Sequence, residues 1–158
     1  MVYTMKTDGM EEISKLLEKM ADAAPAVAAK ALYEGAGIMS AEINSAAAGI
    51  RTGPGATRQD ARYATEEEKA AVQAAGAGIA KFKKDGTEVD TSVGYKAAGY
   101  ATINGKTKPV PLIVNAINSG TSFMHKQPFV RRAAKSGGAK AMAAISKAIE
   151  DAYEDMNK

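Results

Sequence analysis

The side chains most often used in catalysis and metal binding are scarce in this 158-residue chain, which has one histidine and no cysteine. Without cysteine there is no disulfide framework, no thiolate nucleophile and no Cys-ligated zinc or iron–sulfur site. The histidine, His125, falls in a stretch whose composition predicts a loop, and no nucleophile is suggested near it. A general base needs an orienting partner, so we interpret His125 as an ordinary polar residue of a loop or an interface. The sequence predicts no metal site and no cofactor.

Three consecutive carboxylates, Glu66, Glu67 and Glu68, could be imagined as ligands of a metal ion. Successive residues of a helix point about 100° apart, so these carboxylates would not converge on one ion. Thr65 and Glu68 instead have the spacing of a capping box, which predicts a helix from residue 66 to about residue 75. The acidic side chains then lie at the positive end of that helix.

Two glycine-containing stretches approach nucleotide-binding patterns without matching them. A phosphate-binding loop has four residues between its first glycine and its Gly-Lys pair, whereas five residues separate Gly99 from Gly105. Asn104-Gly105 predicts a hairpin turn instead. A dinucleotide-binding fingerprint that starts at Gly76 would need its third glycine at the position of Lys81. We therefore predict a helix that ends in glycine at this point.

Two runs of basic residues could contact phosphate groups, and such runs are also typical of solvated faces. The chain carries 21 Lys and Arg against 18 Asp and Glu, a net charge of +3. Three charges argue for nucleic-acid binding only if they cluster. A small basic DNA-binding protein is therefore the alternative hypothesis of a different class. The two runs consist of Lys81, Lys83 and Lys84, and of Arg131, Arg132, Lys135 and Lys140.

The elements that must position these residues are rich in alanine, with 33 alanines, 9 aromatic residues and no tryptophan in the chain. Alanine favours helix but buries little area. We therefore expect a single domain over residues 1–158 whose wide, thin core is completed in part by neighbouring copies of the chain.

The N-terminal half is predicted to be helical. Asp8 and Glu11 form a second capping box, which predicts the start of a first helix. Pro25 predicts the first turn of a second helix that reaches about residue 50. Gly35 and Gly37 lie inside this second helix. Because each glycine costs about 1 kcal/mol relative to alanine, we expect a close helix crossing or a kink there.

The remainder predicts a small sheet followed by a helix. Asp85-Gly86 and Asn104-Gly105 are turn signals beside the candidate strands 87–95, 100–103 and 106–108. Residues 112–114 suit either a short buried strand or the start of a helix. A helix is predicted from Pro128, interrupted at Ser136-Gly137-Gly138 and continued by an apolar stripe over 142–156. The predicted class is α+β, with long N-terminal helices and a C-terminal helix packed on a small antiparallel sheet.

Two short motifs in the C-terminal half have a distinctive order and spacing. The sequence NSGTS (118–122) is followed by QPFVR (127–131), by Ala133-Ala134 and by a long amphipathic helix. This arrangement resembles the HK97 gp10-like phage tail-component family, whose members typically show Glu-Phe-Gly-Thr-Ser, a short spacer, Gln-Pro-Phe-Leu-Arg-Pro-Ala and a terminal helix. The N-terminal half agrees, with a glycine-led helix at 9–12 and a corner at 51–53. Asn118 stands where the family usually has Glu, and Arg132 replaces the proline. Relative to this family, residues 55–84 are predicted to be an insertion or a mobile segment.

The residues that carry the resemblance, interpreted as motif or subunit-interface residues, are Arg51, Thr52, Gly53, Gly120, Thr121, Ser122, Gln127, Pro128, Phe129 and Arg131. An alternative interpretation is that these residues only connect a sheet to a helix, because their side chains suit such a connection. Glycine permits a strained turn, and Thr and Ser can hydrogen-bond nearby backbone groups. Proline fits a first helical turn, and the phenylalanine is a large apolar anchor.

The resemblance implies assembly rather than catalysis, without a cofactor. Similar proteins act in tail completion or head–tail joining as rings, often hexameric, between the portal-side adaptor and the tail tube. The implied partners are copies of the chain, neighbouring neck or tail-tube proteins, and DNA that passes through the lumen without specific recognition, with no membrane. The implied location is the virion neck or tail, after assembly in the bacterial host cytoplasm. A tail terminator that caps the tail tube is the alternative within this class.

Overall fold

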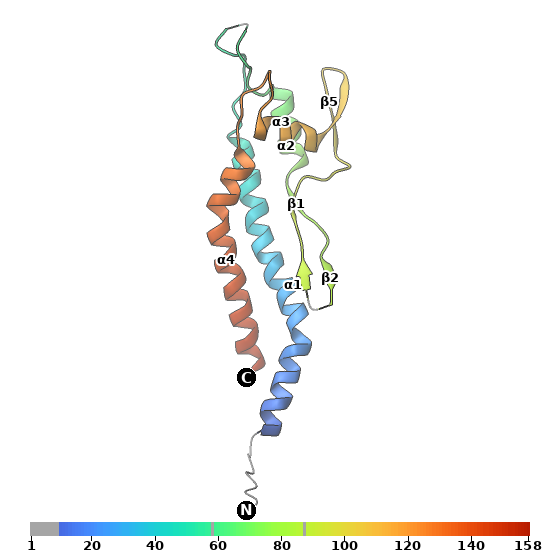
Figure 1. Ribbon diagram of the computed structural model, residues 1–158, viewed down its shortest axis with the longest axis vertical. Helices are drawn as coiled ribbons and strands as arrows, with labels where there is room; N and C mark the ends of the chain where they lie inside the picture. The colour runs from blue at the N-terminus through green and yellow to red at the C-terminus, as the bar shows by residue number, and fades with distance from the viewer. Residues whose placement is uncertain (1–9, 58, 87) are drawn as a thin grey trace, which may run out of the picture.

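The computed structural model describes residues 10–57, 59–86 and 88–158, and it has the predicted α+β class. Two long antiparallel helices lie side by side, α1 (Met10–Ala48) and α4 (Phe129–Met156), as Figure 1 shows. Two short helices, α2 (Glu66–Ala75) and α3 (Val110–Ser119), lie near the end where α1 ends and α4 begins. Among the described helices, none is both long enough and apolar enough to cross a membrane.

The two N-terminal helices predicted from the sequence are one helix, so the prediction of a new helix starting at Pro25 was wrong. Pro25 lies inside α1, flanked by alanines. Alanine has the highest helix propensity, and Ile149 and Tyr153 of α4 line the same small cavity as Pro25. The helix therefore continues past Pro25 because packing against α4 and the high helix propensity of the flanking alanines offset the cost of the proline. The predicted N-cap, Asp8, lies outside the described residues.

The predicted interruption at Ser136-Gly137-Gly138 was also wrong, because α4 continues through it. A Cβ atom on Gly137 would lie 2.9 Å from Cγ of Glu42, and one on Gly35 would lie 2.6 Å from Cδ1 of Ile145. The two glycines therefore let α1 and α4 approach closely. This confirms the expected close crossing at Gly35, whereas a Cβ on Gly37 would meet nothing within 4 Å.

Within the described residues, three separate two-stranded antiparallel sheets take the place of one predicted sheet. The first pairs β1 (Gly78–Ile79) with β4 (Val93–Gly94), and the second pairs β2 (Lys83–Asp85) with β3 (Glu88–Asp90). The third pairs β5 (Tyr100–Ile103) with β6 (Lys106–Pro109) across the predicted Asn104-Gly105 turn. The single strand predicted over 87–95 is thus two strands, and residues 112–114 belong to helix α3.

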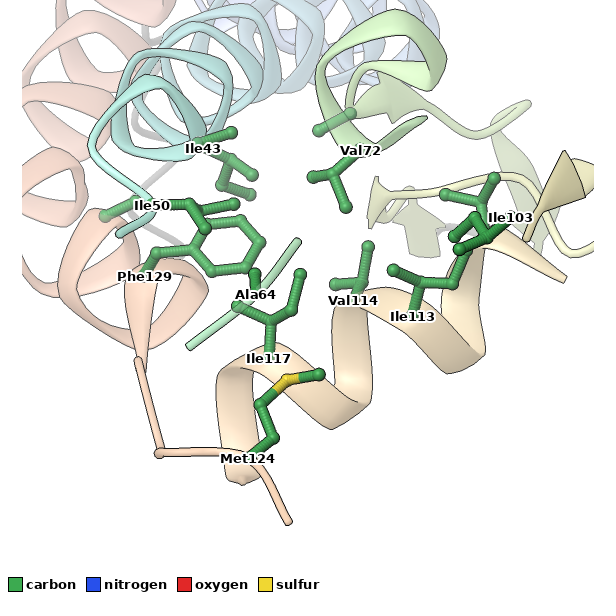
Figure 2. Close-up of a cluster of buried hydrophobic side chains, with 14 residues drawn as sticks. Ile43, Ile50, Ala64, Val72, Ile103, Ile113, Val114, Ile117, Met124 and Phe129 are labelled. Carbon is green, nitrogen blue, oxygen red and sulfur yellow. The ribbon is translucent and has the colours of Figure 1, made fainter. Parts of the chain in front are cut away.

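The main apolar core lies at one end of the helix pair, where all four helices meet. Figure 2 shows Ile43, Val72, Ile117 and Phe129 pointing toward one another from α1, α2, α3 and α4. Val72, Ile117 and Phe129 are the largest fully buried side chains. Residues 64–77, part of the segment predicted to be an insertion or mobile, thus contribute to this core through Ala64, Val72 and Ala77. The prediction that residues 55–84 are an insertion is not tested by this packing and stays a prediction.

Replacing Gly35 and Gly37 separately with alanine tests the close crossing of the two long helices. Alanine at Gly37 gains helix propensity in open space, so we expect Gly37→Ala to stabilise the protein by about 0.5–1 kcal/mol. Gly35→Ala gains the same propensity but forces Ile145 aside, so we expect a net loss of about 1–2 kcal/mol. Thermal unfolding should rank Gly37→Ala above the wild type and Gly35→Ala below it. Equal stabilisation by both variants would contradict the close contact.

Candidate functional site

The centre of the candidate site is the side chain of Gln127, which holds the backbone of Arg51. The Arg51 amide donates to Oε1 of Gln127 at 2.8 Å, and Nε2 of Gln127 donates to the Arg51 carbonyl at 3.0 Å. The Gln127 backbone amide donates to the Ile117 carbonyl at 2.8 Å. Gln127 is buried, so these bonds are shielded from water. One side chain thereby joins the segment after α1, the end of α3 and the start of α4.

Phe129 and Pro128 follow Gln127 and begin helix α4. Phe129 is 1% exposed and belongs to the main core, while Pro128 occupies the N-cap position without a side-chain hydrogen bond. The Val130 amide donates to Oδ1 of Asn118 at 3.2 Å. Asn118 therefore supplies the acceptor that the proline cap lacks. Asn118 occupies the position where the family that these motifs resemble usually has a glutamate.

The corner at Arg51, Thr52 and Gly53 is fastened to the start of α2. Gly53 has a φ of 125°, a conformation that favours glycine. Its amide donates to the Ala64 carbonyl at 3.1 Å, and its carbonyl accepts from the Tyr63 amide at 2.9 Å. The hydroxyl of Thr52 is hydrogen-bonded to the Glu66 carboxylate. The chain therefore leaves α1 along a fixed path.

Gly120, Thr121 and Ser122 form the turn that follows helix α3. Gly120 caps this helix with a φ of 77°, and its amide donates to the Ala116 carbonyl. A Cβ atom there would lie 3.1 Å from the backbone of Lys126, so the turn has no room for a side chain. Thr121 exchanges backbone hydrogen bonds with Met124 and accepts a bond from the Phe123 amide. Ser122 is exposed. The turn thus returns the chain to Gln127.

A half-buried ion pair between Arg62 and Glu68 lies next to this turn. The guanidinium of Arg62 donates to both carboxylate oxygens of Glu68 at 2.8 Å. Glu68 also accepts from the Thr65 amide at 2.8 Å, which completes the capping box predicted for α2. Burial raises the pKa of Glu68, but the hydrogen bonds from Arg62 and Thr65 outweigh it and hold the pKa below its ordinary value. The carboxylate is therefore charged at neutral pH.

The structure separates the basic runs found in the sequence. Lys140 donates to Glu42 at 2.6 Å, and this hydrogen bond lowers the pKa of Glu42. Arg131 is exposed on the first turn of α4. Lys83 and Lys84 lie on β2, and Lys83 is paired in register with Asp90. Strand β2 lies on the side of α1 away from α4 (Figure 1), so the two runs do not combine into one basic face.

Sequence reasoning missed the aromatic contacts of His125. The ring centroids of Tyr63 and His125 are 4.8 Å apart, and the Arg51 guanidinium lies over the Tyr63 ring at 4.6 Å from its centroid. The His125 amide donates to the Arg62 carbonyl at 2.8 Å. Tyr63 lies in a polar stretch without periodicity, so no local signal could have placed it beside these residues.

Comparisons with protein-family models, with curated proteins and with solved structures give no match for this chain. Within the described parts of the chain, no group of three or more His, Asp or Glu side chains is placed to hold a metal ion. Several of the predicted motif residues come together as a structural junction, whereas Ser122 and Arg131 are exposed outside it. It joins the end of α1 to the start of α4 through Gln127, with the turn after Gly120 beside it.

Replacing Glu68 with glutamine tests the ion pair through its pH dependence. At neutral pH we expect Glu68→Gln to lower the free energy of unfolding by about 1–3 kcal/mol, because Arg62 loses its charged partner. The pKa of Glu68 is depressed on folding, so the wild-type advantage is present above the unfolded value of about 4.3. It is lost as the pH falls through the lower folded value. Urea unfolding between pH 7 and pH 3 measures this difference.

Glu67→Gln is the matched control, because Glu67 is exposed in the same first turn of α2. It removes the same charge from the positive end of the helix and leaves the Arg62–Glu68 pair intact. We expect a loss of less than about 1 kcal/mol. Equal losses in the two variants, or a Glu68→Gln loss that does not shrink toward pH 3, would contradict the role given to the ion pair.

Proposed function

We propose that this protein is a structural subunit of a phage or prophage neck or tail, which acts as a ring subunit in tail completion or head–tail joining. The two motifs that resemble the HK97 gp10-like family support this proposal. Gln127 of one motif binds the backbone of Arg51 in the N-terminal corner, although 76 positions separate them in the chain. Two segments that carry the resemblance are therefore in contact in the folded chain, which is compatible with a shared structural role.

The observation that carries the proposal is the exposure of large apolar side chains at both ends of the molecule. The first turns of α1 extend beyond the end of α4 (Figure 1), and there Ile13 is 56% and Leu17 60% exposed. At the opposite end, Leu112 of α3 is 63% exposed and Phe123 of the following turn 78%. Ile13 and Leu17 are four positions apart on α1 and so share one face of the helix, and exposed apolar patches are typical of protein–protein contacts.

The two apolar ends differ in sequence and in the elements that form them, α1 at one end and α3 with its following turn at the other. Contacts between two different faces of identical subunits are heterologous, and such contacts close into rings when the rotation between neighbours allows it. The α1–α4 pair buries mainly alanine and glycine between its helices, including Ala31, Ala36 and Ala141. A core this thin stabilises little by itself, which supports a subunit that is completed by its neighbours.

The self-association of the purified chain tests this proposal. We expect size-exclusion chromatography with light scattering to show assembly that depends on concentration, and negative-stain images to show rings when neck or tail-tube proteins are present. Leu17→Glu places a charge in the exposed apolar stripe of α1. It should weaken assembly about 10- to 100-fold, since burying a leucine contributes about 1.5–3 kcal/mol.

Ser14→Glu is the matched control, because Ser14 is an exposed polar residue in the same part of α1. It introduces the same charge and should leave assembly within about twofold of the wild type. A chain that stays monomeric and never joins neck or tail particles would overturn the proposal. Equal weakening by both variants would show that charge, and not the apolar stripe, governs assembly.

A deletion of the encoding gene separates the two tail functions. Tail completion predicts finished tails that are separate from filled heads, because the joining ring is missing. Tail termination predicts overlong tails, because nothing caps the growing tube. Electron microscopy of the lysate distinguishes the two, and normal infectious particles would exclude both.

A further inference from the structure

A cavity beside the Gln127 junction gathers positive charge. It is an open hollow of about 300 Å³, and the residues that line it include Arg51, Lys126, Arg132 and His125, all of which are exposed. No Asp or Glu lines it. Within the described residues, none of these three cations has a carboxylate oxygen within 4 Å. The cavity therefore presents cations without internal counter-charges.

The local charge at this hollow exceeds what the chain average suggests. The whole chain has a net charge of only +3, from 21 Lys and Arg and 18 Asp and Glu. Three basic residues and no acidic residue line the hollow. Clustered cations in a concave site focus the potential on an anion.

The cavity wall is held by contacts that leave the cationic groups available. Gln127 fixes the Arg51 backbone through two hydrogen bonds, and the Arg51 guanidinium lies over the Tyr63 ring. The His125 backbone is bonded to Arg62. A guanidinium stacked on an aromatic ring keeps its N–H groups free for an oxyanion. An anion would therefore meet a wall whose backbone is already in place.

The first turn of α4 adds a favourable field to the same cavity. Pro128 and Arg132 belong to this turn and line the cavity, and α4 is 28 residues long. The N-terminus of a helix carries partial positive charge, which favours phosphate and carboxylate groups. The amides of Phe129, Val130 and Arg132 already have partners within the protein, so α4 contributes its field rather than free N–H groups. A carboxylate has one negative charge and two oxygens, too few to occupy three cationic side chains. A phosphate has up to two negative charges and more oxygens, so it can contact all three. Arginine also binds phosphate with two N–H groups.

We propose that this cavity is a binding site for a phosphate group, with Arg51, Lys126 and Arg132 as the cationic ligands and His125 as a further hydrogen-bonding group. The proposal does not depend on the function in phage assembly proposed above. The phosphate can belong to a free phosphate compound or to the backbone of a nucleic acid, and the experiment distinguishes these sources.

Titration of the full chain with inorganic phosphate and pyrophosphate, followed by calorimetry and by amide chemical shifts in NMR spectra, tests the site. We expect saturable binding with a dissociation constant below about 1 mM, and shifts that concentrate at Arg51, Tyr63, His125 and Arg132. A 20-base-pair DNA duplex forms the second arm. Affinity for the duplex in the wild type would assign the site to phosphodiesters, whereas binding of inorganic phosphate and pyrophosphate alone would assign it to free phosphate compounds.

The double variant Lys126→Gln/Arg132→Gln should weaken phosphate binding at least tenfold. If the duplex binds, the variant should also make the slope of log K against log salt concentration shallower by about 2, because two phosphate contacts are lost. Arg131→Gln/Lys135→Gln is the matched control, since it removes two exposed charges from the same region outside the cavity lining. We expect it to change phosphate affinity less than about twofold. Circular dichroism of both variants verifies folding, and the wild-type shifts test the site without any variant.

Three results would overturn the proposed phosphate site. The first is the absence of saturable binding of phosphate, pyrophosphate and duplex to the wild type. The second is equal weakening by the two double variants, which would indicate diffuse surface attraction. The third is displacement of phosphate by acetate at equal concentration, which would show a site without preference for phosphate.

Discussion

The junction between α1, α3 and α4 depends on one constraint, the pair of hydrogen bonds between the Gln127 side chain and the Arg51 backbone. Closing a chain segment of this length costs conformational entropy, and the closure brings the end of α1 against the start of α4. The Gln127 amide adds a bond to Ile117 at the end of α3. Removing the side chain would leave a buried amide and carbonyl without partners, which is costly. The antiparallel helix pair and the core around Phe129 both extend from this point.

The elements predicted correctly from the sequence are those that local chemistry specifies. Thr65 and Glu68 define the start of α2 because the capping box closes within one helical turn. Asn104-Gly105 defines its hairpin because few other pairs accept that turn, and Asn104 indeed has a positive φ. Residues 112–114 could not be assigned, because a short apolar run suits a strand and a helix equally.

The errors lie where contacts between distant segments override a local signal. Pro25 and Gly137 usually end helices, but each faces the opposite long helix, and that packing carries α1 and α4 through them. The site was predictable only in part. The motif residues were identified, but the sequence gives no sign that Gln127 would bind Arg51, or that Tyr63 would contact both Arg51 and His125. Such pairings depend on the closed fold.

The same junction connects the two proposals. It fixes the orientation of the long helices, whose apolar ends we propose as contact surfaces, and it supports the wall of the cationic cavity. The most direct test is hydrogen exchange of the Arg51 amide, which donates to Gln127 although its residue is exposed. The account predicts exchange nearly as slow as in the core of α3, and much faster exchange in Gln127→Leu under conditions where that variant is folded. Exchange of the wild-type amide at the rate of an exposed loop would contradict the account.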